Sequence, residues 1–353
     1  MSASPSLVRI GIVGSGGMAE YHAKKFSALP GVSVSACSDR LLDRARGFAE
    51  RMGIPRWFAS TADMAKSGEV DCISTAVADA GHARSALEAL DSGLPVFAEK
   101  PLARTLAEAE SMLARARAAA VPAVVNFSKR NAPAVALARR LVSEGRLGMV
   151  HGAAFSYLQS WLLNDAWGKW DLTPRWRWRV VPGTSTEGVI GDLGSHIMDS
   201  VRFILGEIRS VSCSVTAFTP DPDRPEGQRV PDSCAAVFRM EPGFLVSARA
   251  SWRAPGSLDA FAFTIEGDYG ALAADIADSR DSVRFFDSSS GAWSVLKAPS
   301  VPSTYERFVG EVRGAPGEAP DFTDGVEVQR IIEACAASAR EGRAVPLGAR
   351  IPA

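Results

Sequence analysis

Short apolar runs alternate with amphipathic segments through the first 127 residues of the chain. Apolar runs bounded by turn residues predict buried strands, and apolar positions spaced three or four apart predict helices. The predicted strands are Val8–Val13, Val32–Asp39, Arg56–Ala59, Val70–Val77, Pro95–Pro101 and Pro122–Phe127. The helices predicted between them cover residues 17–29, 41–52, 62–67, 81–92 and 105–119. This alternation is typical of an α/β fold, here a doubly wound parallel sheet with right-handed crossovers.

The pattern changes after about residue 150, where strands follow one another without helices between most of them. The predicted strands are His151–Ser160, Ser210–Thr219, Ser233–Met240, Phe244–Trp252, Phe261–Glu266, Ser282–Asp287 and Trp293–Lys297. Short connections predict a large, mostly antiparallel open sheet in an α+β domain, with one face packed on helices. Closing helices are predicted at Tyr305–Arg313 and Asp324–Gly342. We expect two domains, residues 1–127 and 128–353.

Composition narrows the class of protein. The net charge is −1 and no block of Lys or Arg occurs, so we expect no nucleic-acid partner. No apolar run reaches the roughly 18 residues of a membrane span, and the N-terminus lacks a signal-peptide pattern. The five cysteines form no C-x-x-C pair, which is typical of reduced core thiols in a cytoplasmic protein.

Three small residues follow the first strand at a fixed spacing, Gly14, Gly16 and Ala19. The first glycine permits a tight turn, the second lets the backbone approach a diphosphate, and the third small residue lets the next helix pack closely. The N-terminus of that helix attracts negative charge. The alternative is an ordinary strand-to-helix turn. The residues expected to contact a dinucleotide are Gly14, Ser15, Gly16, Gly17, Met18 and Ala19.

The second strand ends in a carboxylate. Asp39 lies 25 residues after Gly14, close to the spacing expected for an acid that binds the adenosine ribose. A carboxylate there accepts hydrogen bonds from the ribose hydroxyls and repels a 2′-phosphate, which favours NAD. Arg40 keeps NADP as an alternative, because a guanidinium can pair with that phosphate.

Two further motifs carry reactive side chains. Glu99-Lys100-Pro101 ends the fifth predicted strand, at the sheet edge where ligands of open α/β sheets bind. In the second motif, Gly191–Asp199, a regular helix would put Asp192, His196 and Asp199 roughly on one face. A histidine oriented by a carboxylate can exchange a proton near neutral pH. The alternatives are a solvated charge pair, a polar helix face or a metal site; no further ligand cluster supports a metal, so we expect none.

Five of the eight tryptophans lie in residues 161–179, among basic side chains that include Arg177. Aromatic faces suit the C–H faces of a sugar ring, and arginines suit an acidic group. Tryptophan and arginine are equally typical of subunit contacts. We therefore hold two interpretations of Trp161, Trp176 and Arg177, substrate binding and oligomer contact.

The three motifs, in this order and spacing, resemble those of the Gfo/Idh/MocA oxidoreductases, and the resemblance covers nearly the whole chain. It implies an N-terminal Rossmann domain, a nicotinamide cofactor and a sugar, polyol or cyclitol substrate. By position, Lys100 corresponds to the substrate-binding lysine, Asp192 to the substrate-binding carboxylate and His196 to the catalytic histidine. The resemblance also implies cofactor contacts from Val77, His82, Glu99 and Lys100, and a substrate contact from Arg130. Many members carry an aromatic residue before that arginine, where this chain has Lys129.

We therefore expect an NAD(P)-dependent dehydrogenase acting on CH–OH groups, in which His196 or Lys100 accepts the hydroxyl proton. Two alternatives are a glycoside-cleaving enzyme that uses NAD transiently, and a non-catalytic nucleotide-sensing binder. The second domain has too few helices to cover both faces of its sheet, which predicts a homodimer or homotetramer. Val237 and Phe244 are candidates for the uncovered face.

Overall fold

The computed structural model describes residues 7–219 and 229–350. The chain divides into two compact units. The first unit comprises residues up to Asn126 together with Pro302–Gln329, and the second comprises Phe127–Val301 together with the residues from Arg330 onward.

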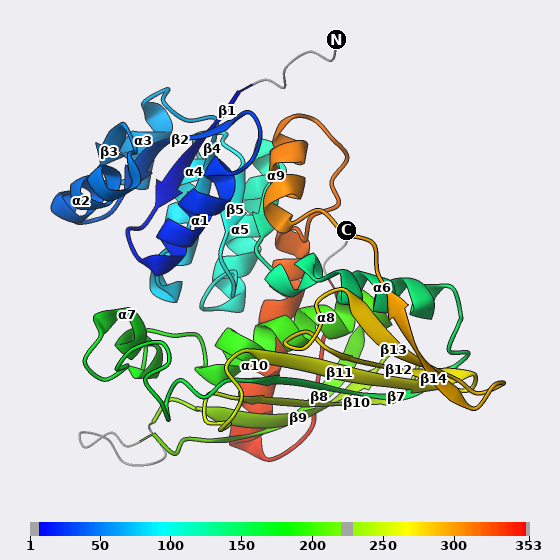
Figure 1. The fold of residues 1–353 in the computed structure, drawn as a ribbon. Coiled ribbons are helices and arrows are strands. Elements are labelled where there is room, and N and C mark those ends of the chain that lie inside the picture. Colours follow the sequence, from blue (N-terminus) through cyan, green and yellow to red (C-terminus); the bar gives the residue numbers. More distant parts are fainter. Residues whose placement is uncertain (1–6, 220–228, 351–353) are drawn as a thin grey trace, which may run out of the picture. The chain divides into compact units, whose positions relative to one another are not determined.

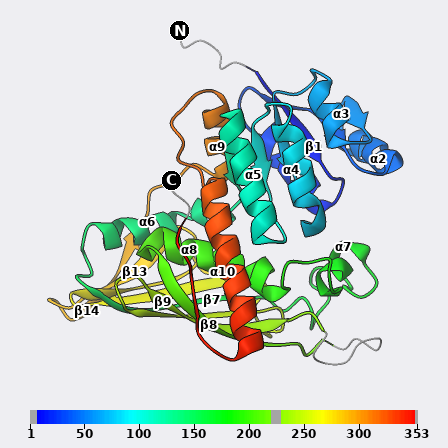
Figure 2. The same cartoon turned by 180° about the vertical axis from the view of Figure 1, so that it is seen from behind.

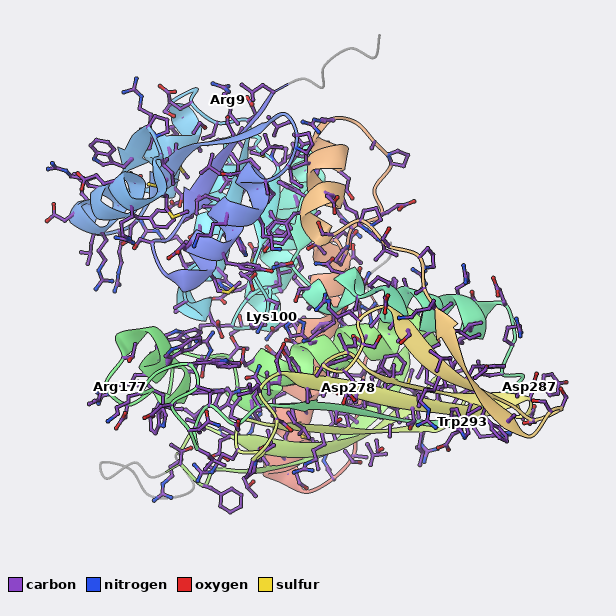
Figure 3. The ribbon with its side chains drawn as sticks, viewed as in Figure 1. Arg9, Lys100, Arg177, Asp278, Asp287 and Trp293 are labelled. Carbon is purple, nitrogen blue, oxygen red and sulfur yellow. The ribbon has the colours of Figure 1, made fainter. Side chains whose placement is uncertain are left out.

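The first unit contains a six-stranded sheet of order β3-β2-β1-β4-β5-β6, in which every pairing is parallel. Its strands are β1 Val8–Val13, β2 Val32–Ser38, β3 Arg56–Phe58, β4 Cys72–Thr75, β5 Val96–Ala98 and β6 Ala123–Val125. Its helices are α1 Gly17–Ser27, α2 Leu42–Met52, α3 Thr61–Lys66, α4 His82–Leu90, α5 Leu106–Ala119 and α9 Thr304–Val312. The prediction of a doubly wound sheet is confirmed. Lys100, labelled in Figure 3, lies two residues after Ala98, the last residue of β5.

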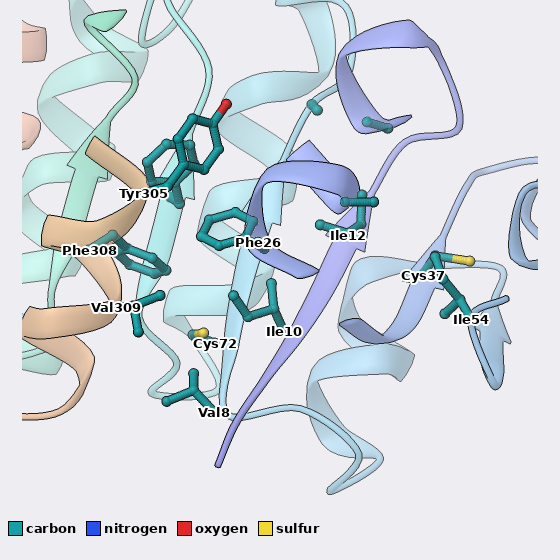
Figure 4. Close-up of a cluster of buried hydrophobic side chains, with 14 of the residues drawn as sticks. Val8, Ile10, Ile12, Phe26, Cys37, Ile54, Cys72, Tyr305, Phe308 and Val309 are labelled. Carbon is teal, nitrogen blue, oxygen red and sulfur yellow. The ribbon is translucent and has the colours of Figure 1, made fainter. Parts of the chain in front are cut away.

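Helices α1 and α9 cover one face of this sheet (Figure 1), and α4 and α5 cover the other (Figure 2). The ring of Phe26 from α1 packs against Tyr305 and Phe308 from α9, at centroid distances of 5.0 and 6.2 Å (Figure 4). All three side chains are buried in the core that also holds Ile10 and Ile12 of β1. Helix α9 belongs to the range predicted for the second domain, 128–353, but these contacts place it in the core of the first unit.

The second unit contains a nine-stranded sheet of order β14-β13-β12-β11-β7-β10-β9-β8-β15. Its strands are β7 Val150–Leu158, β8 Ile208–Thr216, β9 Ser233–Met240, β10 Leu245–Ser251, β11 Ala260–Gly267, β12 Gly270–Asp275, β13 Ser282–Asp287, β14 Ala292–Lys297 and β15 Val345–Pro346. Only the β7–β10 pairing is parallel, so the mostly antiparallel sheet is confirmed. Its helices include α6 Pro133–Ser143, α7 Pro174–Arg177 and α8 Ser195–Leu205, while α10 Phe322–Glu341 contributes to both units.

The two faces of the large sheet differ in their side chains. One face carries buried aromatic residues such as Phe155, Phe238 and Phe261, and helices α6 and α8 contact it at β13 and β7. The other face carries small side chains and forms a hollow of about 1080 Å³. Val237 projects on that face and is 42% exposed, whereas Phe244 is half-buried. Within the described ranges, none of the helices combines the length and apolar content needed to cross a bilayer.

Candidate active site

The glycine turn between β1 and α1 has the geometry of a diphosphate cradle. Gly14 has φ +102°, and a Cβ there would lie 2.5 Å from the carbonyl oxygen of Ala76. A Cβ on the exposed Gly16 would meet nothing within 4 Å, so the backbone is open to a ligand. Helix α1 begins at the next residue and directs its first N–H groups toward the turn. These residues fit a dinucleotide, as the spacing predicted.

Asp39, at the end of β2, is held in a defined orientation. Its Oδ2 accepts a hydrogen bond of 2.6 Å from the Ser15 hydroxyl, and its Oδ1 accepts one of 3.0 Å from the backbone N–H of Leu41. Ser15 therefore orients the carboxylate that we expect to bind the ribose. The neighbouring Arg40 is exposed.

His82 connects two loops at the carboxyl ends of β4 and β5. Its Nδ1 lies 2.8 Å from the carbonyl oxygen of Pro101, and its Nε2 lies 3.1 Å from that of Val77. The side chain is buried. The structure thus gives His82 a role in positioning the backbone of Val77 and Pro101, and its predicted contact with the cofactor stays a prediction.

Beneath Lys100, the carboxylate of Glu99 is the centre of a buried polar network. Its Oε1 accepts hydrogen bonds from His22 Nε2 at 2.9 Å and from Asn126 Nδ2 at 2.7 Å. Its Oε2 accepts one of 3.2 Å from the backbone N–H of Lys100. His22 Nδ1 in turn lies 2.8 Å from Ser74 Oγ. These contacts make Glu99 the support of the loop that carries Lys100, and its predicted contact with the cofactor stays a prediction.

The charge state of Glu99 follows from two opposed effects. Burial raises the pKa of its carboxyl group, while the hydrogen bond and charge of His22, together with Lys100 and Asn126, lower it. The lowering prevails, so the pKa lies below its usual value and Glu99 is ionised at neutral pH. An ionised carboxylate that accepts several N–H groups is a strong anchor for backbone.

In the second unit, Asp192 lies in a π-helical turn, Ile190–Gly194, that leads into α8. This wider turn changes the register that a regular helix would give between Asp192 and His196. Asp192 Oδ2 accepts a hydrogen bond of 3.0 Å from Trp252 Nε1 and lies 3.8 Å from Arg179 Nε. His196 and Asp199 lie three residues apart in regular α8, whereas Asp192 precedes it in the π turn, so the placement of all three on one face stays a prediction.

The tryptophan-rich segment forms an aromatic cluster behind Asp192. Trp161 is 4% exposed and packs against Trp252 at 5.2 Å and Trp176 at 6.3 Å between ring centroids. Trp176 stacks on Trp167 and donates a hydrogen bond to the carbonyl oxygen of that residue. Trp161 thus supports Trp252, which holds Asp192. Neither sequence interpretation of this segment included that role; Arg177 is exposed in α7 (Figure 3).

His196, near the start of α8, is buried against Tyr157 of β7. The two rings meet edge to face with centroids 5.7 Å apart. The Tyr157 hydroxyl donates a hydrogen bond of 2.5 Å to Asp259, and the Lys129 Nζ lies 4.1 Å from the Tyr157 ring centroid. Burial and then the charge of Asp259 raise the pKa of Tyr157 well above its usual value. Tyr157 therefore stays neutral beside the imidazole.

Arg130 and Asp199 form a buried ion pair. The guanidinium contacts both carboxylate oxygens, with Nε–Oδ2 at 3.0 Å and Nη2–Oδ1 at 2.5 Å, and it lies over the ring of Phe203. Two parallel hydrogen bonds of this kind fix geometry strongly. The structure gives Arg130 the role of anchoring α8, and its substrate contact stays a prediction.

Some residues of these clusters were not identified from the sequence: Tyr157, Gln159, Trp252 and Asp259. Tyr157 lies at an inward position of the alternating pattern of β7, which is the one local signal available. Asp259 precedes β11 and is brought to Tyr157 by strand pairing across 102 residues. Only the tertiary structure reveals such a contact.

The parallel sheet and its glycine turn define a dinucleotide-binding protein of the Rossmann type. The family described as "Oxidoreductase family, NAD-binding Rossmann fold" matches residues 8–127, and the "GFO/IDH/MocA C-terminal domain" matches residues 135–273. The chain therefore belongs to the GFO/IDH/MocA oxidoreductases, and its first unit binds NAD.

Several characterised proteins are similar over much of the chain. Levoglucosan dehydrogenase of Pseudarthrobacter phenanthrenivorans is 25% identical over 296 residues, which cover 75% of this chain and 73% of that protein. D-apiose dehydrogenase of Paraburkholderia graminis is 24% identical and covers 95% of this chain and 88% of its own. A solved levoglucosan dehydrogenase in complex with NADH superposes with a TM-score of 0.87 at 22% identity, over 97% of this chain and all of that one (100%).

The Glu99 network predicts a pH-dependent loss of stability in Glu99→Gln. Because the folded-state pKa is lowered, ionised Glu99 stabilises the fold above about pH 4.5, and this contribution is lost as the pH falls through the folded-state value. We expect a loss of about 1–3 kcal/mol at pH 7 that shrinks as the pH falls below 4.5. Thermal unfolding across this range measures it. Glu88→Gln, which removes the half-buried partner of the exposed Arg84, is the control and should cost less than about 0.5 kcal/mol.

The geometry of Asp39 predicts its effect on cofactor choice. Asp39→Ala should weaken NAD binding by about tenfold or more and strengthen NADP binding or leave it unchanged, because the carboxylate binds the ribose hydroxyls of NAD and repels the 2′-phosphate of NADP. Ser15→Ala, which keeps the charge and removes one orienting hydrogen bond, should have a smaller effect. Fluorescence titration with NADH and NADPH measures both. A wild-type preference for NADP of tenfold or more would contradict the assignment.

Proposed function

We propose that this oxidoreductase transfers a hydride between a secondary alcohol of a sugar, sugar acid or cyclitol and NAD. The proposal is supported by the activities named for its relatives, levoglucosan dehydrogenase and D-apiose dehydrogenase. The observation that carries it is the buried Glu99 network, which holds the backbone of Lys100 at the carboxyl end of β5. Ligands of open parallel sheets bind at that edge.

When bound, NAD would supply a nicotinamide ring as the acceptor of a hydride from the alcohol carbon. In our proposal, residues of the chain transfer the hydroxyl proton and bind the substrate oxygens. His196 takes the hydroxyl proton as the C–H bond breaks, leaving a ketone. The Lys100 ammonium binds the same oxygen and stabilises its developing negative charge, and Asp192 binds a neighbouring hydroxyl.

The residues proposed to hold the cofactor are the turn Gly14–Ala19, Asp39 and the loops bearing Val77 and Lys100. A diphosphate fits the exposed backbone at Gly16 and the N-terminus of α1. NAD is favoured over NADP by the carboxylate of Asp39, and the five free cysteines are in keeping with a cytoplasmic location.

A panel of polyols, aldoses, uronates and inositols tests the reaction class. Purified protein with NAD should produce NADH, at 340 nm, with at least one member of the panel. Release of a sugar from a glycoside without net NADH would instead support transient oxidation followed by elimination. Nucleotide binding with no turnover on any member would overturn the proposed dehydrogenase.

The proposed roles predict that Lys100→Ala and His196→Ala each lower turnover by at least about 10²-fold. The affinity for NAD should change little, because neither side chain is assigned to the adenosine half. His151→Ala is the matched control, because His151 is exposed and pairs with Asp268 at 2.6 Å far from the motifs in sequence. Near-normal turnover of His196→Ala at every pH would remove this histidine from proton transfer.

We also propose that the small-residue face of the nine-stranded sheet pairs two copies of the chain, giving a homodimer or a tetramer built from dimers. The hollow of about 1080 Å³ on this face is lined in part by exposed apolar side chains, among them Val237 and Val295, which a second copy would cover. Its lining of alanine and serine permits close approach of a second sheet.

The proposed pairing predicts that Val237→Arg converts the assembly to a monomer of 37.4 kDa in light scattering at micromolar concentration. Leu172→Arg is the matched control, since Leu172 is 72% exposed in the tryptophan-rich segment. Dissociation by Leu172→Arg alone would place the contact in that segment instead.

A further inference from the structure

A buried lysine, Lys129, contacts the same tyrosine ring as the imidazole of His196. Lys129, in the 3₁₀ turn Ser128–Asn131, has a side chain that is only 9% exposed. Its Nζ lies 4.1 Å from the Tyr157 ring centroid, 5.5 Å from that of Phe261 and 3.4 Å from Asp259 Oδ2. A buried ammonium is costly unless a carboxylate and aromatic faces compensate it, and both are present here.

Asp259 is bound from three directions. Its Oδ1 accepts hydrogen bonds from the Tyr157 hydroxyl at 2.5 Å and from Gln159 Nε2 at 3.0 Å, while Oδ2 faces Lys129. Burial raises the pKa of Asp259, but the charge of Lys129 and these hydrogen bonds outweigh burial and lower it. Lys129, Tyr157 and Asp259 thus form one unit, in which a direct ion pair of 3.4 Å is held against a neutral ring.

The same ring contacts His196, edge to face at 5.7 Å and an interplanar angle of 64°. Lys129 Nζ lies 4.1 Å from the centroid of the Tyr157 ring, and the centroid of the His196 ring lies 5.7 Å from the same point. The ammonium therefore lies within roughly 10 Å of the imidazole, about one Debye length. Lys129, Tyr157 and His196 are all buried, so the interaction between the ammonium and the imidazole is less screened than one between exposed charges.

We propose that Lys129 and Asp259 are positioning residues for His196: joined across Tyr157, they fix its imidazole and set the pH at which it loses its proton. This inference rests on the proposed role of His196 as proton acceptor. The two charges act in opposite directions. Lys129 disfavours the imidazolium form and Asp259 favours it, so the balance of the pair keeps His196 available as a base near neutral pH.

Other charges surround α8 and stay unchanged in the test. Asp192, in the preceding π turn, is bonded to Trp252 and lies 3.8 Å from Arg179. Asp199, on α8 itself, is matched by Arg130. From α6, Arg139 lies over Phe203 at 4.3 Å. These groups set a background that the substitutions at Lys129 and Asp259 do not alter.

The test is an NMR titration of His196 in the full chain without substrate. The chain has four histidines, so selective labelling of the imidazole Cε1 gives a simple spectrum, and His196→Gln assigns the signal. Lys129→Met should raise the titration midpoint by at least about half a pH unit, and Asp259→Asn should lower it by a similar amount. Lys129→Arg, which keeps the cation, should restore the wild-type midpoint.

Shifts of the His196 midpoint in opposite directions in the two variants support the inference. If Lys129 and Asp259 had only a structural role, the direction of the shift would not depend on the charge that is removed. Shifts in the same direction, or none, overturn it. NADH binding and circular dichroism establish that each variant is folded, and Lys129→Gln replaces Lys129→Met if the latter is not. The titration needs no turnover, so its outcome is separate from that of the proposed function. An active His196→Gln overturns the catalytic role of His196. A midpoint that is the same in wild type, Lys129→Met and Asp259→Asn overturns the positioning role of Lys129 and Asp259.

The acidic limb of kcat/KM provides a second measurement of the same effect. Where turnover is measurable, the limb should move to higher pH in Lys129→Met and to lower pH in Asp259→Asn. Limbs that do not follow the NMR midpoints would also count against the inference.

Discussion

The buried carboxylate of Glu99 is the interaction on which the first unit depends. Parallel strands end in loops whose backbone has no ladder partners, and a loop that carries a reactive lysine needs another source of order. Glu99 supplies it by accepting hydrogen bonds from His22, Asn126 and the backbone N–H of Lys100. Asn126 also accepts from Thr304 and donates to Tyr305, so α9, from much later in the chain, closes the same network. One ionised group thus couples the position of Lys100 to the packing of the whole nucleotide-binding core.

In the second unit, pairs of side chains from different elements hold the reactive groups in position. Its charges are paired with partners from other elements: Arg130 with Asp199, Lys129 with Asp259, and Asp192 with Trp252. Each pair joins a turn or helix to the large sheet or to α8, and aromatic rings cover the pairs from one side. Arg130, Asp199 and Lys129 are buried, and buried charges are costly to separate from their partners, which favours a single orientation of these side chains. The imidazole of His196 therefore lies in a rigid polar environment rather than on a mobile loop.

Much of the fold and part of the candidate site could be predicted from local sequence, and the other features depend on contacts between residues far apart in the chain. The turn at Gly14 and the strand ending at Asp39 were predictable because backbone geometry dictates their residue types within a few positions. Strand β12, Gly270–Asp275, was missed because small residues give it little apolar or β-branched signal. The π turn before α8 was read as regular helix, since an inserted residue leaves the apolar pattern nearly intact. The hydrogen bond between His22 and Glu99 spans 77 residues, and no periodicity reports it.

This contrast bears on where substrate preference resides. The nucleotide-binding turn works through backbone N–H groups and glycine geometry, so it tolerates wide variation in the side chains around it. The face of the large sheet beneath α8 works through side-chain pairs, and each pair needs both members. Replacing Lys129 alone would leave the half-exposed carboxylate of Asp259 bonded to Tyr157 and Gln159 but without its cation. Because Lys129, Tyr157 and Asp259 contact one another, a change in any one of them alters the polarity around His196.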